Sequence, residues 1–563
     1  MAFLTALTLL TSTALTLTLF PFLFRLVGRA LGAQIRSKTQ QRRDLLLARA
    51  AAEEEQERAS PPHTSAGSQP ADSSTSLDDD WEKVRKEEGR KTPPTTASPP
   101  NTTTATSPTN ITTNNASQSG DGYEGIIAFF HPFCNAGGGG ERVLFAAIEA
   151  TQQKYPRALC LVYTGDHDAS KAQILSNVRT RFNIALAAPR IAFLYLGKRD
   201  FVLASKWPHF TLLGQSLGSL ILGWEAFGML APDIFIDTMG YAFTLGLCKW
   251  LFPDCPTGAY VHYPTISTDM IRSLHSDVAS GEGGLHAGMG QGARGKVKEI
   301  YWELFAKLYC WVGGHVDVVM TNSTWTQAHM QSLWRHFRTQ SGKQHAIEVV
   351  YPPCAVGELQ EKIPITLESE DRRTPNLLYI AQFRPEKNHT TILSAFTQFL
   401  KSHPNLPDPK PKLILVGSVR DDHDEKRVYK LRLQAQEVKD QVEFVVNSSW
   451  DRILELLRTS SVGVNGMWNE HFGIGVVEYQ AAGLISVVSA SGGPKMDIVT
   501  PVDGKPTGKS SLEEQMDGRT KWMTLVPLDP SLLAVGAIQA IRAPFFFEPS
   551  VKTVADKELL SFF

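Results

Sequence analysis

The chain has 563 residues, of which 42% are hydrophobic, and its formal net charge is −1. This length has room for roughly two to four domains with a sizeable core, and the near-neutral charge argues against a protein that coats nucleic acid. Six cysteines, at positions 134, 160, 248, 255, 310 and 354, form no CxxC pair. We therefore expect reduced thiols rather than a zinc site or a disulfide framework.

Residues 1–25 predict a membrane anchor. Positions 2–24 carry no charge and consist mostly of Leu, Thr, Ala and Phe, and this length fits a membrane-spanning helix. Basic residues begin at Arg25 and Arg29, and no Lys or Arg precedes the span. By the positive-inside rule the rest of the chain then lies in the cytosol. A cleaved signal peptide is the alternative, although it would usually have a basic start and a shorter apolar core.

Residues 44–121 differ in composition from the chain that follows and predict a disordered linker. A charged stretch that ends at Arg58 favours a short solvated helix, after which Ser, Thr, Pro and Asn dominate with hardly an aromatic residue. Such a stretch cannot bury enough apolar area to fold. Its glycosylation sequons, at Asn101, Asn110 and Asn115, would stay unmodified if they face the cytosol.

Residues 122–355 predict a first α/β domain. Short apolar runs alternate with helical patterns, which favours a parallel, doubly wound sheet. We expect its strands at residues 126–130, 158–163, 191–196, 234–237, 259–262 and 316–321. The apolar segment 210–231 contains four glycines and allows two interpretations, contact with a membrane surface or a buried helix pair.

A glycine-rich loop follows the first of these strands. Residues 131–136 lead into four consecutive glycines at 137–140, and an apolar pattern from Val143 then predicts a helix. Strand, glycine loop and helix in this order are typical of a turn that binds phosphate. The loop has neither the lysine of a Walker A motif nor a complete GxGxxG, and an ordinary flexible loop is the alternative.

His262 is predicted to lie at the end of a strand, within the segment 260–264. Open α/β sheets bind ligands at the carboxyl ends of their strands, so the position favours a functional side chain. A lone histidine is, however, more often structural, and both interpretations stay open at this point.

Residues 374–508 predict a second doubly wound α/β domain. The expected strands are 377–381, 413–416, 442–446, 461–465 and 485–489, and the expected helices are 390–400, 426–438, 450–457 and 475–482. Two such domains in tandem leave a cleft between their strand ends, which is a favoured place for ligands.

Two cations, Arg384 and Lys387, come directly after the first strand of this second domain. They lie three positions apart where a helix is expected to start. Their charges could neutralise a diphosphate there. A solvated loop with ordinary surface charges is the alternative.

Glu470 and Glu478 stand eight positions apart around a glycine-rich apolar run. Glycines at 473 and 475 allow the backbone to approach a ligand closely. The helix expected after them offers free N–H groups near Ile474 and a positive dipole end for phosphate. The two carboxylates could then bind hydroxyls on both sides of a diphosphate, which is the layout of a nucleotide sugar. A buried helix with a capping acid is the alternative.

Together these motifs resemble, in the same order, those of retaining GT-B glycosyltransferases with an EX7E carboxylate pair. The shared segments are HPFCNAGGGGER (131–142), YVHYP (260–264), RPEKN (384–388), the pair Glu470 and Glu478, and SGGPKMDIV (491–499). Within these enzymes, the glycine-rich segment and YVHYP are most similar to the endoplasmic-reticulum α-1,2-mannosyltransferases of asparagine-linked glycan assembly. The resemblance covers about residues 125–508.

The resemblance implies a GT-B fold, with 122–355 as acceptor domain and 374–508 as donor domain. It implies transfer of mannose from GDP-mannose to dolichol-linked Man3GlcNAc2 and then Man4GlcNAc2, giving Man5GlcNAc2. The reaction would take place on the cytosolic face of the endoplasmic reticulum membrane. Other mannosyltransferases of the pathway are candidate partners, and nucleic acid is not one.

It also implies roles for single residues at the donor. Glu470 would bind the transferred mannose, and Glu478 would bind the donor ribose. Arg384 and Lys387 would bind the diphosphate and stabilise the leaving phosphate as its charge develops. Backbone contacts to the donor would come from Ile474 and Gly475, and from Gly139 and Gly140 in the first domain.

His262 would then lie near the reacting centre or the acceptor. Enzymes of this family need no bound metal, and we expect none here. The implied route keeps the leaving phosphate and the attacking hydroxyl on one face of the sugar. It therefore uses no protein nucleophile, unlike the two-carboxylate scheme of retaining glycosidases.

Residues 509–563 depart from the family's pattern, because Pro544, Pro549 and a Phe cluster stand where a long final helix is expected. Three other functions remain as alternatives at this point. They are another GT-B transferase that uses a nucleotide sugar, a non-catalytic GT-B scaffold subunit of a mannosyltransferase complex, and a dehydrogenase with two dinucleotide folds. The incomplete GxGxxG argues against the last of these.

Overall fold

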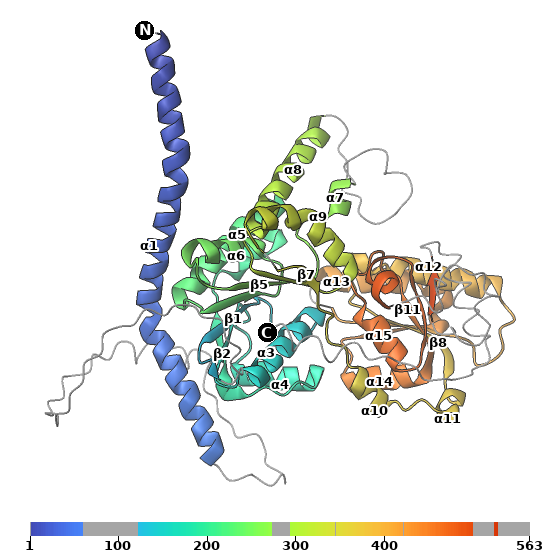
Figure 1. The fold of residues 1–563 in the computed structure, drawn as a ribbon. Helices are drawn as coiled ribbons and strands as arrows, with labels where there is room; N and C mark the ends of the chain where they lie inside the picture. The colour runs from blue at the N-terminus through green and yellow to red at the C-terminus, as the bar shows by residue number, and fades with distance from the viewer. Residues whose placement is uncertain are drawn as a thin grey trace.

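The computed structural model describes residues 2–59, 122–272, 293–343, 345–419, 422–498 and 523–526 (Figure 1). Residues 60–121 of the predicted linker, with its three sequons, lie outside this part of the chain. So does the tail beyond 508, apart from residues 523–526.

The first domain is built on a sheet of seven parallel strands in the order β3-β2-β1-β4-β5-β6-β7. The strands are β1 Ile126–Phe130, β2 Leu159–Thr164, β3 Ile191–Tyr195, β4 Ile234–Asp237, β5 Thr257–Val261, β6 Val318–Thr321 and β7 Ile347–Val349. The six predicted strands are confirmed to within two residues at each end. The seventh has only three residues, one of them Glu348, and is too short to show a pattern.

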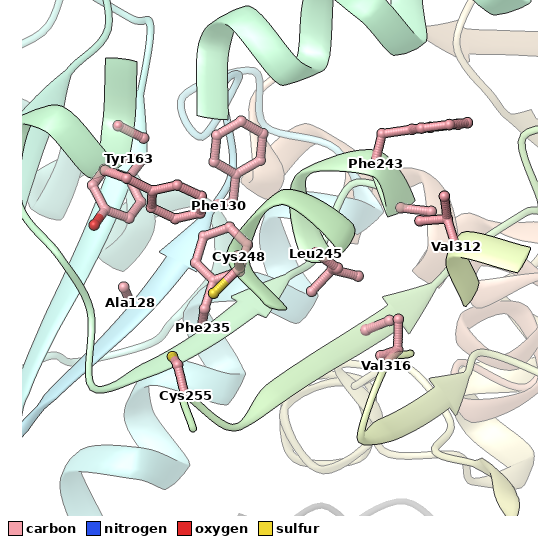
Figure 2. Close-up of a cluster of buried hydrophobic side chains, with 14 of the residues drawn as sticks. Ala128, Phe130, Tyr163, Phe235, Phe243, Leu245, Cys248, Cys255, Val312 and Val316 are labelled. Atoms are coloured by element: carbon pink, nitrogen blue, oxygen red, sulfur yellow. The ribbon is translucent and has the colours of Figure 1, made fainter. Parts of the chain in front are cut away.

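Helices cover both faces of this sheet. They are α3 Gly139–Lys154, α4 Lys171–Phe182, α5 Thr211–Met229, α6 Ala242–Leu251, α7 Thr268–Arg272, α8 Ala293–Gly313 and α9 Thr324–Gln340. Figure 2 shows the core on one face, where Phe130 and Phe235 of the strands meet Cys248 and Leu245 of α6. The aromatic rings of Phe130 and Phe235 have their centroids 6.0 Å apart.

The apolar segment 210–231 forms the single helix α5 rather than a helix pair. One face is buried in this core through Leu222, Ala226 and Phe227. The opposite face exposes Leu217, Ile221 and Trp224. One side of this helix therefore belongs to the core, and the other side lies on the protein surface. Each of the two interpretations of the sequence described only one of these sides.

The helix α1, Ala2–Ala59, is a single element 58 residues long. Residues 44–59, which the linker prediction included, belong to this helix and are held to the first domain by ion pairs. Glu54 contacts Arg190 at 2.5 Å, and nearby Arg43 contacts Asp233 at 2.6 Å. Within the described residues, no helix is long and apolar enough to cross a membrane, so the anchor predicted at 1–25 is not supported.

The second sheet has six parallel strands in the order β10-β9-β8-β11-β12-β13. They are β8 Thr374–Ile380, β9 Leu413–Gly417, β10 Val442–Val446, β11 Ser460–Asn465, β12 Ile485–Ser489 and β13 Met523–Val526. The first five confirm the predicted strands, with the largest difference at the start of β8. The sixth comes from the tail, so this sheet includes residues beyond 508.

The helices of the second half are α10 Val356–Lys362, α11 Leu367–Asp371, α12 His389–Ser402, α13 Asp422–Gln434, α14 Trp450–Thr459 and α15 Ile474–Ala481. The prediction placed α13 four residues too late. Its first turn holds Asp422 and Asp424, and acids stabilise a helix start. Val438, the last residue of the predicted helix, has a non-helical backbone.

Both sheets are wound in the same way. In each of them the order in which successive strands are added reverses beside the first strand of the sheet. The reversal lies between β1 and β4 in the first sheet and between β8 and β11 in the second. Loops diverge at such a point and leave room for a ligand at the carboxyl ends of the strands. The glycine loop follows β1, the Arg384–Lys387 segment follows β8, and the Glu470 loop follows β11.

We predict that Gly32→Ala loosens α1 from α6. A Cβ atom at Gly32 would lie 1.8 Å from the backbone oxygen of Leu251, so the two helices must separate. Overpacking of this kind costs about 1–3 kcal/mol. Thermal unfolding should show a lower midpoint, and hydrogen exchange should increase over residues 28–50.

The matched control is Gly228→Ala in α5, where a Cβ atom meets nothing within 4 Å. Alanine is favoured over glycine in a helix by about 0.5–1 kcal/mol, so this variant should unfold at the same or a higher temperature. Equal midpoints for the two variants would contradict the packing described for α1.

Candidate active site

The glycine loop of the first domain is held by its own helix. The backbone N–H of Gly138 donates to Oε2 of the buried Glu141 at 2.7 Å, which fixes the start of α3. A Cβ atom at Gly139 would lie 3.0 Å from Cδ1 of Ile474, and one at Gly140 would lie 3.6 Å from Nε2 of His262. The loop therefore brings four of the predicted site positions together across the two domains.

His262 follows β5 and is half-buried beside the fully buried His131, which follows β1. Burial lowers the pKa of His262 to about 4, and burial with the charge of His262 lowers the pKa of His131 to about 3. Both rings are therefore neutral at pH 7. Nδ1 of His131 bonds to the hydroxyl of Thr238 at 2.7 Å, whereas Nε2 of each histidine has no hydrogen-bond partner among the described residues. An unpartnered Nε2 near Gly140 can serve a ligand.

Lys387 and Glu470 form an ion pair, with Nζ 2.6 Å from Oε2. Asn465, the last residue of β11, donates from its amide to the same oxygen at 3.2 Å. Burial alone would raise the pKa of Glu470, but the charge of Lys387 and these hydrogen bonds hold it below its ordinary value. Glu470 is therefore an ionised acceptor, suited to hydroxyl donors.

Arg384 lies in the same loop but is not brought to Glu470. Its guanidinium is about one-third exposed and contacts Glu386 at 3.9 Å. The loop itself is anchored, because the hydroxyl of the buried Tyr379 donates to the backbone oxygen of Lys387. Arg384 thus lies on an anchored backbone, and its side chain is partly exposed to solvent.

The helix α15 begins at Ile474, directly after Gly473. Gly473 has φ of 107°, a conformation that other residues rarely adopt. A Cβ atom at Gly475 would lie no closer than 3.8 Å to another residue, the backbone oxygen of Ile380. The first N–H groups of a helix have no intrahelical acceptor, so the backbone of Ile474 and Gly475 can bind an anion.

Glu478 lies one turn further along α15 and pairs with a residue that the sequence analysis did not single out. Its Oε1 is 3.0 Å from Nη1 of Arg142 in α3, and both side chains are nearly buried. Burial raises the pKa of Glu478, and the charge of Arg142 opposes this rise. The pair links the two domains directly. Arg142 stood inside the glycine-rich motif, but nothing in the pattern indicated a partner 336 positions away.

Aromatic rings form a second link between the domains. The imidazole of His471 stacks on Tyr263 with ring centroids 4.3 Å apart, and it lies parallel to Trp325 at 5.6 Å. Burial lowers the pKa of His471 to about 4, so the stack contains a neutral ring. Tyr263 and His471 lie within the recognised motifs, and Trp325 does not.

Asp497 forms a third link, from the π-helical turn η8, Pro494–Ile498. It accepts hydrogen bonds from the backbone N–H of Thr324 and from the hydroxyl of Tyr351, both at 3.0 Å. Thr324 is the first residue of α9, so a carboxylate of the second domain caps a helix of the first. This contact between the two domains could not be predicted from either segment alone.

Comparisons with known proteins agree with this architecture. One family model, described as ALG11 mannosyltransferase N-terminus, matches residues 124–334, and another, described as glycosyl transferases group 1, matches residues 363–508. A Neurospora crassa protein named GDP-Man:Man(3)GlcNAc(2)-PP-Dol alpha-1,2-mannosyltransferase is 60% identical over 433 residues, covering 74% of this chain and 78% of that protein. The human protein of that name is 47% identical over 394 residues, covering 68% and 76%.

Among solved structures, that of Anabaena Alr3699/HepE in complex with UDP and glucose matches with a TM-score of 0.45 and 13% identity. The match covers 74% of this chain and 90% of that one, and at such a distance it assigns no function. Two parallel doubly wound sheets, together with the group 1 match, confirm the predicted α/β fold of GT-B type.

We predict that Arg142→Met destabilises the protein more at pH 8 than at pH 5. The substitution leaves Glu478 buried without its cation, which costs about 3 kcal/mol when the carboxylate is ionised. Burial already raises the pKa of Glu478, and loss of Arg142 raises it further. Protonation therefore removes most of the cost at low pH, and the cost grows as the pH rises above the ordinary pKa.

The matched control is Arg157→Met, which breaks an ion pair of similar length, 2.7 Å, between the exposed Arg157 and Glu124. Exposed pairs contribute little, so this variant should unfold like the wild type at both pH values. Thermal unfolding of the three proteins at pH 5 and pH 8 is the measurement. A pH-independent loss in Arg142→Met would contradict the assignment.

Proposed function

The chain belongs to the family of GDP-Man:Man(3)GlcNAc(2)-PP-Dol alpha-1,2-mannosyltransferases, and from this premise we propose the reaction that it catalyses. It transfers mannose from GDP-mannose, in α-1,2 linkage, to dolichol-diphosphate-linked Man3GlcNAc2. It then extends the Man4GlcNAc2 product once more, which gives Man5GlcNAc2 of the asparagine-linked glycan pathway.

This proposal rests on two nearly buried carboxylates, one before the start of α15 and one after it. Each of them forms an ion pair with a cation. Glu470 contacts Lys387 within the second domain, and Glu478 contacts Arg142 from the first. Free backbone N–H groups lie between them. A nucleotide sugar presents hydroxyls, a diphosphate and hydroxyls in the same sequence, so acids at the two ends and donors in the middle complement it.

In this arrangement Glu470 binds hydroxyls of the transferred mannose, and Glu478 binds the ribose. Lys387, with Arg384 turned inward, neutralises the diphosphate as the bond to the sugar breaks. The N–H groups of Ile474 and Gly475 add donors to the same phosphate. Lys387 would then contact both the carboxylate of Glu470 and the leaving phosphate. The positions of these two groups would therefore depend on each other.

The first domain forms the side of the donor site that faces these residues. Gly139 and Gly140 bring backbone to the donor where a side chain would collide with Ile474 or approach His262. The neutral imidazole of His262 faces the reacting sugar or the acceptor hydroxyl through Nε2. Because Lys387 and Asn465 both hold Glu470, this carboxylate is placed as a binding group. The reaction then retains the α configuration by attack on the face that the phosphate leaves.

For localisation, we propose the cytosolic face of the endoplasmic reticulum membrane, with the apolar start of α1 as the attachment. A dolichol-linked acceptor stays in a membrane, so an enzyme that acts on it gains from being held there. The apolar composition of the stretch 2–24 supports this proposal, because such side chains gain from leaving water.

We predict that Glu470→Gln and Lys387→Ala each lower turnover on the order of 10²-fold or more, because each removes a charge that acts on the transition state. The assay supplies GDP-mannose and a trimannosyl lipid-diphosphate acceptor and counts the sugars added. Wild-type protein should add two mannoses. Addition of none by the wild-type protein would refute the proposed reaction.

Lys401→Ala is the control for Lys387→Ala. Lys401 is exposed in α12 and pairs with Glu437 at 2.5 Å, so it forms a lysine–glutamate contact of the same kind away from the proposed site. Its loss should leave turnover within about two-fold of the wild type. Near-normal rates in both site variants would reject the residue assignments while leaving the family assignment intact.

A second prediction concerns attachment. Deletion of residues 2–18 should release part of the protein from microsomal membranes and leave the affinity for GDP-mannose unchanged. The deletion ends before Phe24, whose ring stacks on Trp250 at 4.9 Å, so the packing of α1 on α6 is preserved. Unchanged membrane attachment, measured by sedimentation, would contradict the role given to this segment.

A further inference from the structure

Arg142 of the first domain contacts a carboxylate of the second domain that the proposed function assigns to the ribose. It belongs to α3, directly after the glycine loop, and its Nη1 lies 3.0 Å from Oε1 of Glu478 in α15. Figure 1 shows α3 and α15 on the two sides of the domain junction. The two side chains are only 12% and 11% exposed, so dissolved salt screens this ion pair little.

The carboxylate of Glu478 has a second hydrogen-bond donor in the segment that joins the two domains. The backbone N–H of the buried Ala355, just before α10, donates to it. An ionised carboxylate has about four lone-pair sites for hydrogen-bond donors. Arg142 and Ala355 occupy two of them, so about two sites stay available to a ligand.

A ribose presents two neighbouring hydroxyls, which form a matching pair of donors. Glu478 lies four residues after Ile474, the first residue of α15, which is about 6 Å along the helix axis. The proposed diphosphate binds at that helix start. The 2′- and 3′-hydroxyls of a nucleoside 5′-diphosphate are separated from its phosphates by a comparable length, the length of the sugar ring. Glu478 is therefore placed for the diol, provided that its carboxylate is ionised and correctly oriented.

Burial works against an ionised Glu478. It raises the pKa of this carboxyl, and the charge of the nearby Glu358 raises it as well. The charge and the hydrogen bond of Arg142 both lower the pKa of Glu478. A protonated carboxyl would present an O–H donor where the diol needs an acceptor. Arg142 therefore preserves the form of Glu478 that can accept two hydroxyl donors.

Arg142 is itself held in place from two sides. Its backbone N–H donates to the oxygen of Gly138 at 3.2 Å, within the first turn of α3. Its Cζ lies 6.0 Å from the centroid of the Phe182 ring at the end of α4, and a guanidinium is attracted to an aromatic face. The contact with Oε1 of Glu478 thus comes from a cation with a defined position, which can fix the orientation of the carboxylate.

We propose that Arg142 is the positioning residue through which the enzyme recognises the ribose of its nucleotide donor. It acts on the ribose through Glu478 and not by a contact of its own. The preference of the second domain for a ribonucleotide therefore depends on a side chain of the first domain. This inference rests on the proposed function, because it takes Glu478 as the ribose-binding group.

The test measures how the full chain distinguishes GDP from 2′,3′-dideoxy-GDP, two nucleotides that differ only in the diol. Calorimetric titration gives both affinities. The wild-type protein should bind GDP at least about ten-fold more tightly, because hydroxyls that bond to a charged acceptor contribute strongly. In Arg142→Met this preference should fall below about three-fold, mainly through weaker binding of GDP. A role in folding alone would weaken both nucleotides equally.

Two single variants complete this comparison. Arg142→Lys keeps a cation that can reach one carboxylate oxygen, so it should restore part of the preference for GDP. The matched control is Arg157→Met, which breaks the exposed pair with Glu124 and should keep the wild-type preference.

The double variant Arg142→Met/Glu478→Gln keeps the proposal testable if Arg142→Met folds poorly, because it removes both charges and buries no unpaired one. If Arg142 acts through Glu478, the double variant should match Glu478→Gln in both affinities within about two-fold. Weaker binding of both nucleotides by the double variant would overturn the proposal, because Arg142 would then contact the nucleotide directly.

The remaining outcomes separate this inference from the proposed function. An undiminished preference for GDP in Arg142→Met would overturn the inference and leave the proposed reaction standing. Equal affinities of the wild-type protein for the two nucleotides would overturn the ribose role of Glu478 and the inference with it. A wild-type protein that binds no GDP would contradict the proposed donor itself.

Discussion

A buried carboxylate is costly unless a cation or several hydrogen bonds accompany it, and this constraint organises the place where the two domains meet. Glu478 is nearly buried in one domain and takes its cation, Arg142, from the other. Glu470 takes its cation from the neighbouring loop. The second domain thus balances one acid internally and depends on the first domain for the other. The relative position of the domains is therefore part of the chemistry of the site.

Two further contacts restrain the same junction, and they differ in kind. The stack of His471 on Tyr263 is neutral, because burial holds the pKa of the imidazole at about 4. The contact of Asp497 with α9 is instead polar, because its side chain accepts a hydrogen bond from the backbone N–H of Thr324 at the helix start. His471 directly follows Glu470, which is proposed to bind the donor sugar. Binding of a nucleotide sugar would thus act on the loop that also carries the stacking contact between the domains.

The sequence predicted the two sheets well because their strands are short apolar runs buried on both faces, as in β1 and β11. Prediction from the sequence was less reliable where tertiary packing determines which face of a helix is buried or where a helix begins. The segment 210–231 has the composition of a buried or membrane helix, and only its packing on α6 shows which face is which. The helix boundary at α13 shifted because acids at Asp422 and Asp424 favour an earlier start.

At the site, local motifs predicted positions but not pairings. Glu470, Lys387 and Gly139 are recognisable from spacing, and their neighbours across the junction are not. Arg142, His471 and Asp497 each stood inside a recognised segment, yet their partners lie between about 150 and 340 positions away. Periodicity carries no information about such distances, since only the folded arrangement of two domains brings the groups together.

The sixth strand of the second sheet, β13, has a consequence for how the chain is made. It pairs with β12 through residues 523–526, which follow the other five strands of this sheet and the whole first domain in the chain. During synthesis the first domain, including all seven of its strands, is complete long before those residues leave the ribosome. The emerging second domain meanwhile carries β12 as an unpaired edge, a surface prone to wrong pairing. A chain that stopped between residues 489 and 523 would keep β12 as an unpaired edge permanently.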